Sequence, residues 1–470
     1  MEIKRFYLFA LSLLLFSGCM SKPGNFETLE DFHKAFSAGP SLPPALQAGG
    51  VLTLKEALKT ALVNNPTLQA ALQAVQAARY GYCQALSAYA PEINASGSAG
   101  HTLSRGWELK NPPVGVMKKN DHFVSMGTIQ ASFLLFDGFA RELDVLIARQ
   151  KYNQSAADGK NIRRLLVRAV TYAYYDMILA EEEIRIYSED QDFQNDALRQ
   201  AEERFRNGHV SKASVLNFKI LASRARSSML NARYRRQTAC HALTALMGYD
   251  PRLMRQEFRL EKLSAAQQYV IRDEGFYLEL AIRSRPDLKA ERILLDIVYR
   301  NRQKALADFL PKIYLFSEFS LNTYNAEYGA YRVSSARSKQ GVFTYGAEGK
   351  WNLFRGFYSF NKLRREEVLE EIALRKLNAK YLEILAEVKD AHANCQNTRQ
   401  QTNIYQRMTD WVREQRDLVY SEYQNGRETI TRLNEAQSLL VEAQSRFVIS
   451  AVQFNKAAEQ LAAATGIDRL

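Results

Sequence analysis

The sequence contains an internal repeat that spans nearly the whole chain. The segment ALKTALVNNPTLQAAL at 57–72 reappears as YLELAIRSRPDLKAER at 277–292, which sets Pro66 against Pro286. Farther along, three glycine-containing segments repeat at an offset that is the same for all three and almost the same as that of the prolines. The paired glycines are Gly138 with Gly356, Gly208 with Gly426, and Gly248 with Gly466. A near-constant offset over this length indicates a duplicated unit, so the fold must be built from two copies of one structure.

Each copy reads as a helix, two strands, a very long helix and a return helix. Residues 139–207 contain no proline and a single glycine, so as one helix they would reach about 100 Å. The second return helix carries apolar or small residues in a sustained three-four spacing, which is a heptad seam. Its members are Leu433, Ala436, Leu440, Ala443, Phe447, Ser450, Phe454, Ala457, Leu461 and Ala464. The first copy keeps the seam except at Arg236, and the predicted fold is mixed, mainly α, with long antiparallel coiled-coil hairpins.

Between the helices the hydrophobic period changes to two, which indicates strands. The last such stretch alternates an apolar face, from Phe343 to Leu353, with a polar face that carries Glu348. The third stretch is less regular because Tyr314 and Phe316 fall on its polar face. The predicted strands lie at about 91–106, 122–137, 311–325 and 341–354.

Alternation of this kind fits either a half-buried sheet in a soluble protein or a transmembrane β-barrel with lipid outside and water inside. Four strands cannot close a barrel, and an open edge in lipid leaves backbone groups without hydrogen bonds. Several chains must then contribute strands. Two chains would give eight strands and a filled interior, whereas three would give 12 strands and room for a pore. The pattern therefore favours a trimeric transmembrane barrel.

The N-terminus carries an export signal. Its apolar run at 6–16 follows two basic residues and is too short to span a bilayer. A basic start, an apolar stretch and small residues predict a signal peptide over 1–18 rather than a buried helix. The order FSGC at 16–19 resembles the lipobox of bacterial lipoproteins, which implies that Cys19 becomes an acylated N-terminus. Met20 after it implies sorting to the outer membrane.

Composition excludes several function classes. The formal net charge of +12 suggests nucleic acid, but the basic clusters lie in helical stretches with acidic residues nearby and an exported chain rarely meets DNA. We therefore expect no nucleic-acid partner. Cys83, Cys240 and Cys395 are scattered and odd in number, so no disulfide framework follows. Because no metal-ligand cluster, phosphate-binding loop or nucleophile motif occurs, we expect no metal, no cofactor and no enzymatic activity.

The repeat order, the strands and the export signal resemble the TolC-type outer membrane efflux proteins, or outer membrane factors, over about 51–470. The resemblance implies a homotrimer with a 12-stranded barrel in the bacterial outer membrane and an α-helical barrel crossing the periplasm. It implies a periplasmic adaptor protein and an inner-membrane transporter, of RND or ABC type, as partners. The implied function is the channel-tunnel of a tripartite efflux system or, alternatively, the outer membrane component of type I protein secretion.

A protein of another class stays open as an alternative, namely a lipid-anchored periplasmic coiled-coil scaffold without a pore. Its strands would form a soluble sheet. The domain organisation is the same in either case. We expect a signal peptide at 1–18, a lipid-anchored linker at 19–50, a first repeat at 51–250, an inter-repeat linker at 251–274 and a second repeat at 275–470.

Two glycine turns join the long helices to their return helices and match the periplasmic tips of the family. The resemblance assigns these tips to adaptor docking, although a tight reversal alone would also need glycine. The first tip consists of Asn207, Gly208, His209 and Val210, and the second of Asn425, Gly426 and Arg427.

Many relatives carry acidic residues just beyond the second tip, where three chains form a narrow ring. The aligned positions in this sequence are Arg432 and Glu435. Arg432 departs from the acidic pattern, which puts a cation-binding ring in doubt. We predict instead a pore constriction formed by a mixed girdle of both charges, held by pairs between subunits.

Replacement of Cys19 tests the lipid anchor. We expect Cys19→Ala to abolish labelling by a fatty-acid analogue and to shift the protein out of outer-membrane fractions without unfolding it, because the acyl chains supply the membrane affinity of such an anchor. Cys83→Ala is the matched control and should keep the label. Unchanged labelling of Cys19→Ala would overturn the lipoprotein hypothesis.

Overall fold

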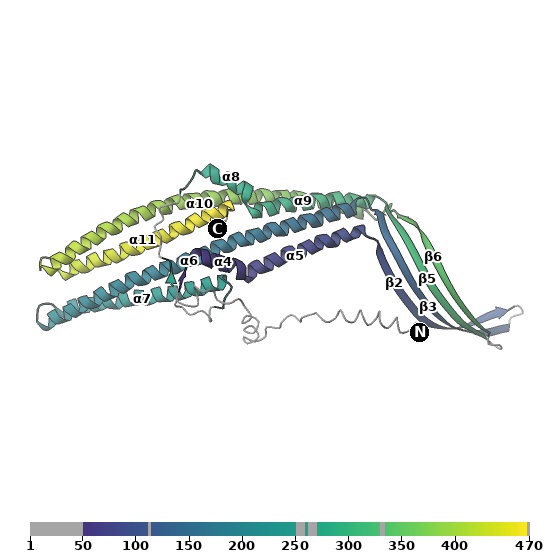
Figure 1. Cartoon of the computed structure of the whole chain (residues 1–470), viewed down its shortest axis with the longest axis horizontal. Coiled ribbons are helices and arrows are strands. Elements are labelled where there is room, and N and C mark those ends of the chain that lie inside the picture. Colours follow the sequence, from purple (N-terminus) through teal and green to yellow (C-terminus); the bar gives the residue numbers. More distant parts are fainter. Residues whose placement is uncertain (1–49, 111–113, 251–258, 262–269, 330–333, 468–470) are drawn as a thin grey trace. The chain divides into compact units, whose positions relative to one another are not determined.

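A computed structural model of the chain describes residues 50–110, 114–250, 259–261, 270–329 and 334–467. The predicted signal peptide and Cys19 lie outside the described residues. The same order of elements occurs twice (Figure 1). The first copy contains α4 (Leu54–Asn64), α5 (Pro66–Leu86), the 3-10 helix η2 (Ser87–Tyr89), β2 (Glu92–Lys110), β3 (Val114–Phe136), α6 (Ala140–Arg206) and α7 (Lys212–Leu246). The second contains α8 (Glu274–Ser284), α9 (Pro286–Leu306), η3 (Ala307–Phe309), β5 (Lys312–Gly329), β6 (Ser334–Lys350), α10 (Tyr358–Gln424) and α11 (Ile430–Thr465).

The two long helices, α6 and α10, have 67 residues each and so extend about 100 Å. Each copy opens with a shorter helix whose start is encoded locally. Thr53 caps α4 with a capping box that includes Glu56, and the side chain of Asp273 caps α8 by accepting from the Gly275 N–H. Among the described residues, no helix combines the length and the apolar content needed to cross a bilayer.

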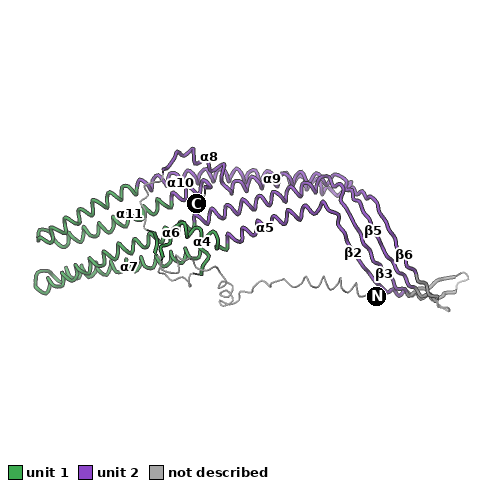
Figure 2. The backbone as a smooth tube through the Cα atoms, viewed as in Figure 1, with its two compact units in different colours: residues 1–66, 169–267, 401–456 green, residues 67–168, 268–400, 457–470 purple. Residues whose placement is uncertain are grey.

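Contacts divide the chain into two compact units, coloured separately in Figure 2. Unit 1 contains the ends of the helical hairpins that carry the glycine turns, and unit 2 contains the sheet and the helices that adjoin it. The residues of unit 1 are 1–66, 169–267 and 401–456, and those of unit 2 are 67–168, 268–400 and 457–470.

The heptad seam of α11 forms much of the buried core. Leu433, Ala443 and Phe454 are almost fully buried, whereas Phe447 is only half-buried. In α7 the charged seam position Arg236 has a partner, because its Nε donates to Glu181 Oε1 at 3.3 Å. The return helices therefore pack along the predicted stripe, and the one charge in that stripe is hydrogen-bonded rather than left unpaired.

The sheet has four antiparallel strands in the order β2-β3-β5-β6, with the hairpin of each copy side by side (Figure 1). Strands β3 and β5 join the two copies. Two further short strands, β1 (Val51–Leu52) and β4 (Arg259–Leu260), pair in parallel. Among the described residues, no strand pairs with the outer edges of β2 and β6. The predicted fold class is confirmed: the chain is mainly α, with duplicated helical hairpins and one four-stranded sheet.

The strand ends differ from the ranges expected from alternation. The β2–β3 ladder runs on to the pair Lys110–Val114, beyond the predicted ends, because backbone pairing continues where the apolar alternation fades. In contrast, β6 stops at Lys350 rather than at 354. The reason is that β5 begins at Lys312, opposite Lys350, and offers no partner beyond it.

A buried ionic network holds the end of α11 within unit 2. Arg285, 3% exposed, binds Asp287 Oδ2 at 2.6 Å and Glu387 Oε2 at 2.6 Å, and its Nη1 also donates to the carbonyl of Ala464 at 3.0 Å. Burial alone would raise the pKa of Asp287. Hydrogen bonds and charge from Arg285, with Arg164 and Lys380 nearby, lower that pKa to about 2.

Asp287 provides a test of this network. Because its folded-state pKa lies below the unfolded value of 3.8, the ionised carboxylate stabilises the fold above about pH 4, and this contribution is lost as the pH falls towards 2. We expect Asp287→Asn to lower the free energy of unfolding by about 2 kcal/mol at pH 6 and by much less at pH 2. Thermal unfolding at both pH values measures this.

The matched control is Asp296→Asn on the same helix, where Asp296 pairs with Arg300 at a partly exposed site. Its expected cost is under about 1 kcal/mol. If the loss in Asp287→Asn were equal at both pH values, the ionised carboxylate would not be the stabilising group.

Candidate functional site

Both glycine turns have the same backbone construction. In the first, the His209 N–H donates to the Arg204 carbonyl at 2.9 Å and the Gly208 N–H donates to the Phe205 carbonyl at 2.9 Å. The second repeats this pair of bonds, as Arg427 to Glu422 at 2.9 Å and Gly426 to Tyr423 at 3.0 Å. This is the Schellman arrangement, which requires a left-handed residue. Gly208 and Gly426 supply it with φ of +75° and +72°.

Each return helix then begins at a hydroxyl cap. Ser211 Oγ accepts from the Ser214 N–H at 3.3 Å, and Thr429 Oγ1 accepts from the Arg432 N–H at 3.2 Å. These caps satisfy orphan N–H groups at the start of α7 and α11. The glycine that ends each long helix and the hydroxyl that caps the return helix together fix a reversal of only a few residues. The predicted tip residues therefore form two exposed turns at the ends of their hairpins (Figure 1).

Side chains of the two hairpins meet just behind the tips, within unit 1. Tyr423 and Leu433 belong to a buried cluster on α10 and α11, and Phe193 of α6 packs against it. Ile430 packs against this cluster and also against a second one that contains Phe218 of α7. The first residue of α11 thus contacts both hairpins.

The predicted constriction residues lie on the exposed side of α11. Arg432 Nη1 and Glu435 Oε2 are 3.1 Å apart, one helical turn from each other in sequence, and both side chains are about half exposed. Their seam neighbours Leu433 and Ala436 are buried. The pair therefore flanks the packed seam and points away from it, and within one chain the two charges bind each other.

A polar cluster behind the second tip has no counterpart among the sequence predictions. Asp190 Oδ1 accepts from Gln194 at 3.4 Å and from Gln437 at 3.3 Å. Burial raises the pKa of Asp190, and these two hydrogen bonds oppose the rise. Nearby on α11, Asn434 is 6% exposed, and its amide atoms have no hydrogen-bond partner among the described residues. The only sequence signal is that two polar residues, Asn434 and Gln437, directly follow the seam residues Leu433 and Ala436.

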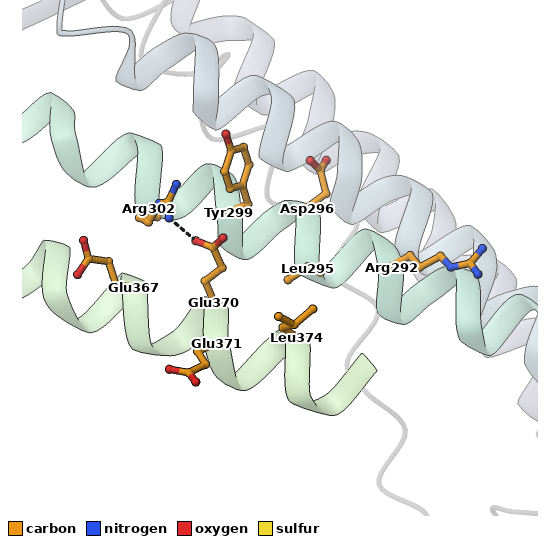
Figure 3. A pocket seen from close by; sticks show the side chains of 9 residues that line it. All are labelled: Arg292, Leu295, Asp296, Tyr299, Arg302, Glu367, Glu370, Glu371 and Leu374. Atoms are coloured by element: carbon orange, nitrogen blue, oxygen red, sulfur yellow. Dashed lines mark ion pairs between the residues drawn. The ribbon is translucent and has the colours of Figure 1, made fainter. Parts of the chain in front are cut away.

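A groove of about 570 Å³ lies between α9 and α10 in unit 2 (Figure 3). Arg302 and Glu370 form an ion pair of 3.1 Å across it, and Leu295 faces Leu374. Its lining is completed by Arg292, Asp296, Tyr299, Glu367 and Glu371. Within the described part of the chain no group of histidine, cysteine, aspartate and glutamate residues could hold a metal ion. The groove is thus a surface depression between two helices, with charged side chains around a leucine pair.

Both copies of the repeat match a known protein family. The sequence model of the Outer membrane efflux protein family matches residues 57–249 and 277–467, one segment for each copy of the repeat. The chain belongs to the outer membrane efflux protein family.

Solved structures of other bacterial outer membrane proteins share this fold. VceC of Vibrio cholerae is 18% identical, with a TM-score of 0.72 over 88% of this chain and 96% of VceC. The CmeC outer membrane channel of Campylobacter jejuni is 14% identical, with a TM-score of 0.75 over 88% of this chain and 85% of CmeC. These likenesses show that the fold is shared over both the helices and the strands.

A curated relative matches part of the chain. The alkaline protease secretion protein AprF of Pseudomonas aeruginosa is 24% identical over 297 residues. The alignment covers 59% of this chain and 58% of AprF, so it spans less than two thirds of that protein.

Proposed function

We propose that three copies of this chain form an outer membrane channel-tunnel that passively conducts substrates of a tripartite efflux system from the periplasm or the transporter to the exterior. The observation that carries the proposal is the four-stranded sheet, whose outer strands β2 and β6 have no further partner in the part of the chain that the structure describes. Its strands have 17 to 23 residues, longer than the roughly 9–11 that a transmembrane strand needs. Because an edge in lipid must be paired, the sheet has to be completed by other chains.

One face of this sheet is apolar and open. Large side chains at alternate positions of all four strands are exposed: Ile93, Ile129, Leu315, Phe319, Phe343 and Tyr345. An apolar surface that extends over four strands is more than a soluble monomer ordinarily leaves in water. Contact with lipid hydrocarbon would cover it, with the polar face turned to a water-filled lumen. This argues against the periplasmic scaffold without a pore.

The remaining assignments belong to the same proposal. The tips 207–210 and 425–427 dock a periplasmic adaptor, which links the channel to an inner-membrane transporter of RND or ABC type. Cys19 carries lipid after removal of the signal peptide, so the protein is anchored in the outer membrane and extends into the periplasm. The channel is a conduit rather than an enzyme and needs no cofactor.

Protein secretion is the second candidate for the cargo. It is favoured by one observation, the partial match to AprF, whose name assigns it to the secretion of an alkaline protease. A wide conduit selects weakly, so the same channel architecture serves either cargo. The choice would lie with the transporter.

Pore formation tests the proposal directly. We expect the purified protein in detergent to have the mass of three chains by light scattering and to form stable ion-conducting channels in planar bilayers, because three sets of four strands close a water-filled barrel. Gel mobility that changes on heating checks for an intact barrel. A clean monomer, or a trimer without conductance, would refute the channel and leave the scaffold.

The charge pair beyond the second tip generates a further prediction. We expect Arg432→Ala with Glu435→Ala to raise single-channel conductance and to increase antibiotic leakage into cells, with little loss of trimer. An exposed pair contributes under about 1 kcal/mol to stability, whereas three copies crowded at a constriction would restrict ion flow.

The control is Arg446→Ala with Glu442→Ala, a pair on the same helix with Nη2 and Oε1 2.7 Å apart and nearly the same exposure. It should leave the conductance unchanged. Wild-type conductance and ion selectivity in the Arg432/Glu435 variant would place the gate elsewhere.

A further inference from the structure

The second hairpin of the sheet breaks the alternation of apolar and polar residues at one place. On β5, Tyr314 and Phe316 fall on the otherwise polar face, which the proposed channel turns to its lumen. Leu134 of β3 lies directly opposite Tyr314, so these large side chains adjoin one another on that face. All three are partly exposed. Large apolar groups gathered on a wall that faces water are informative, because nothing in the alternation of the strand calls for them.

The first hairpin serves as an internal control for these positions. The offset from Pro66 to Pro286 carries Tyr314 back to Asn94 and Phe316 back to Ser96. The ladder between β2 and β3 runs unbroken through both positions. Small polar residues are therefore sufficient for strand pairing at this place in the repeat, and the aromatic rings are not required by the fold.

The Phe316 ring has a seat on the neighbouring strand. Phe316 lies opposite Gly346 of β6, and a Cβ on that glycine would lie 3.3 Å from the ring atoms Cε1 and Cζ. The ring therefore rests against the backbone of β6. In the first copy the equivalent pair is Ser96 with Thr128. The aromatic ring and the glycine that admits it thus occur together in the second copy alone.

Two glutamates border the aromatic pair on the same face. Glu348 lies directly opposite Tyr314, and Glu318 lies farther along β5 at the next position of that face. Glu318 is partly exposed and Glu348 is exposed. The equivalent residues in the first copy, Ser98 and Gln130, are uncharged. The second hairpin therefore adds carboxylates as well as rings to the wall.

The chain does not neutralise these two carboxylates. The nearest lysines on the polar face are Lys312 and Lys350, which lie directly opposite each other at the helix end of the ladder. Among the described residues, neither lysine forms an ion pair with Glu348, and Glu318 also has no cationic partner. Both carboxylates are left to attract a positive charge that comes from outside the chain.

We propose that Tyr314, Phe316, Glu318 and Glu348 form a contact site for amphipathic organic cations that pass through the channel. An aromatic ring offers apolar area for stacking and attracts a cation through its π face, and a nearby carboxylate adds charge attraction. The inference rests on the proposed channel and deepens it by naming a substrate class. In the trimer, three such sites lie around the lumen.

A purely structural role would explain only part of this arrangement. An aromatic side chain opposite a strand glycine covers backbone that the glycine leaves bare, so Phe316 could serve Gly346 alone. Tyr314 has no glycine opposite it, because its neighbours in the ladder are Leu134 and Glu348. The experiment below distinguishes the two roles.

Block of single-channel current by tetraphenylphosphonium, an aromatic organic cation, tests the site. We expect reversible block of the wild-type trimer. The variant Tyr314→Asn with Phe316→Ser introduces the first-copy residues and should raise the half-blocking concentration by roughly fivefold or more, because it removes both rings. Glu318→Gln with Glu348→Gln should also raise it. Benzenesulfonate, an aromatic anion, should not block, and tetraethylammonium, a cation without rings, should respond to the glutamate variant alone.

The matched control is Phe319→Ser, which removes a ring from the opposite, apolar face of the same strand and should leave the half-blocking concentration unchanged. Channels that conduct but are not blocked, or are blocked equally in every variant, would overturn the site and leave the channel intact. Block that depends on the glutamates but not on the rings would overturn it as well, and would leave Phe316 with the shielding of Gly346.

Assembly and conductance of each variant are measured on the same samples. If the aromatic variant does not form a trimer by light scattering, the glutamate variant decides, since its side chains differ from the wild type in charge and hardly in shape. Unchanged block in that variant would overturn the site. Wild-type protein without conductance would instead refute the proposed channel itself.

Discussion

Hydrogen bonding at the two outer edges of the sheet is the constraint on which the rest of the structure depends. Strands β2 and β6 each present a row of N–H and C=O groups that no described strand satisfies. Water can satisfy such groups, but hydrocarbon cannot. A chain that places this sheet in a membrane must therefore supply a complementary edge. In the proposed trimer, other copies of the chain supply that edge.

The two copies share backbone geometry at equivalent positions even where their side chains differ. Asn65 and Arg285 occupy the same place in the repeat, and each donates to a carbonyl at the end of its return helix: Asn65 to Leu246 at 2.9 Å and Arg285 to Ala464 at 3.0 Å. Gly248 and Gly466, with φ of +81° and +78°, end those helices in the same way. In the second copy, Asp287 and Glu387 also form ion pairs with Arg285 at this helix end. A helix end needs a donor at this point, and either an amide or a guanidinium provides it.

The sequence predicts those features that depend on period and offset, and it misses those that depend on distant partners. The repeat and the seam were sufficient to predict the hairpins and the burial of Leu433 and Phe454. Phe447 lies on the same seam but is only partly buried, since the heptad pattern does not specify what packs opposite each position. The hydrogen bond from Gln437 to Asp190 joins α11 of the second copy to α6 of the first, and no motif connects segments so distant in the sequence. The strand end at 354 was overestimated because alternation cannot reveal that, among the described residues, β5 offers no partner beyond Lys350.

The two tips share a backbone but differ in charge, and this limits how a ring of them can act. By the repeat offset, the second-copy pair Arg432 and Glu435 corresponds to Ser214 and Asn217, which are uncharged. Likewise, half-buried Ile430, which packs against both hairpins, corresponds to exposed Lys212. In the proposed trimer, charge pairs would lie beyond only one of the two kinds of tip. A partner that grips every tip would then have to recognise the shared Schellman turn, and one that discriminates between them would have to recognise the side chains that follow it.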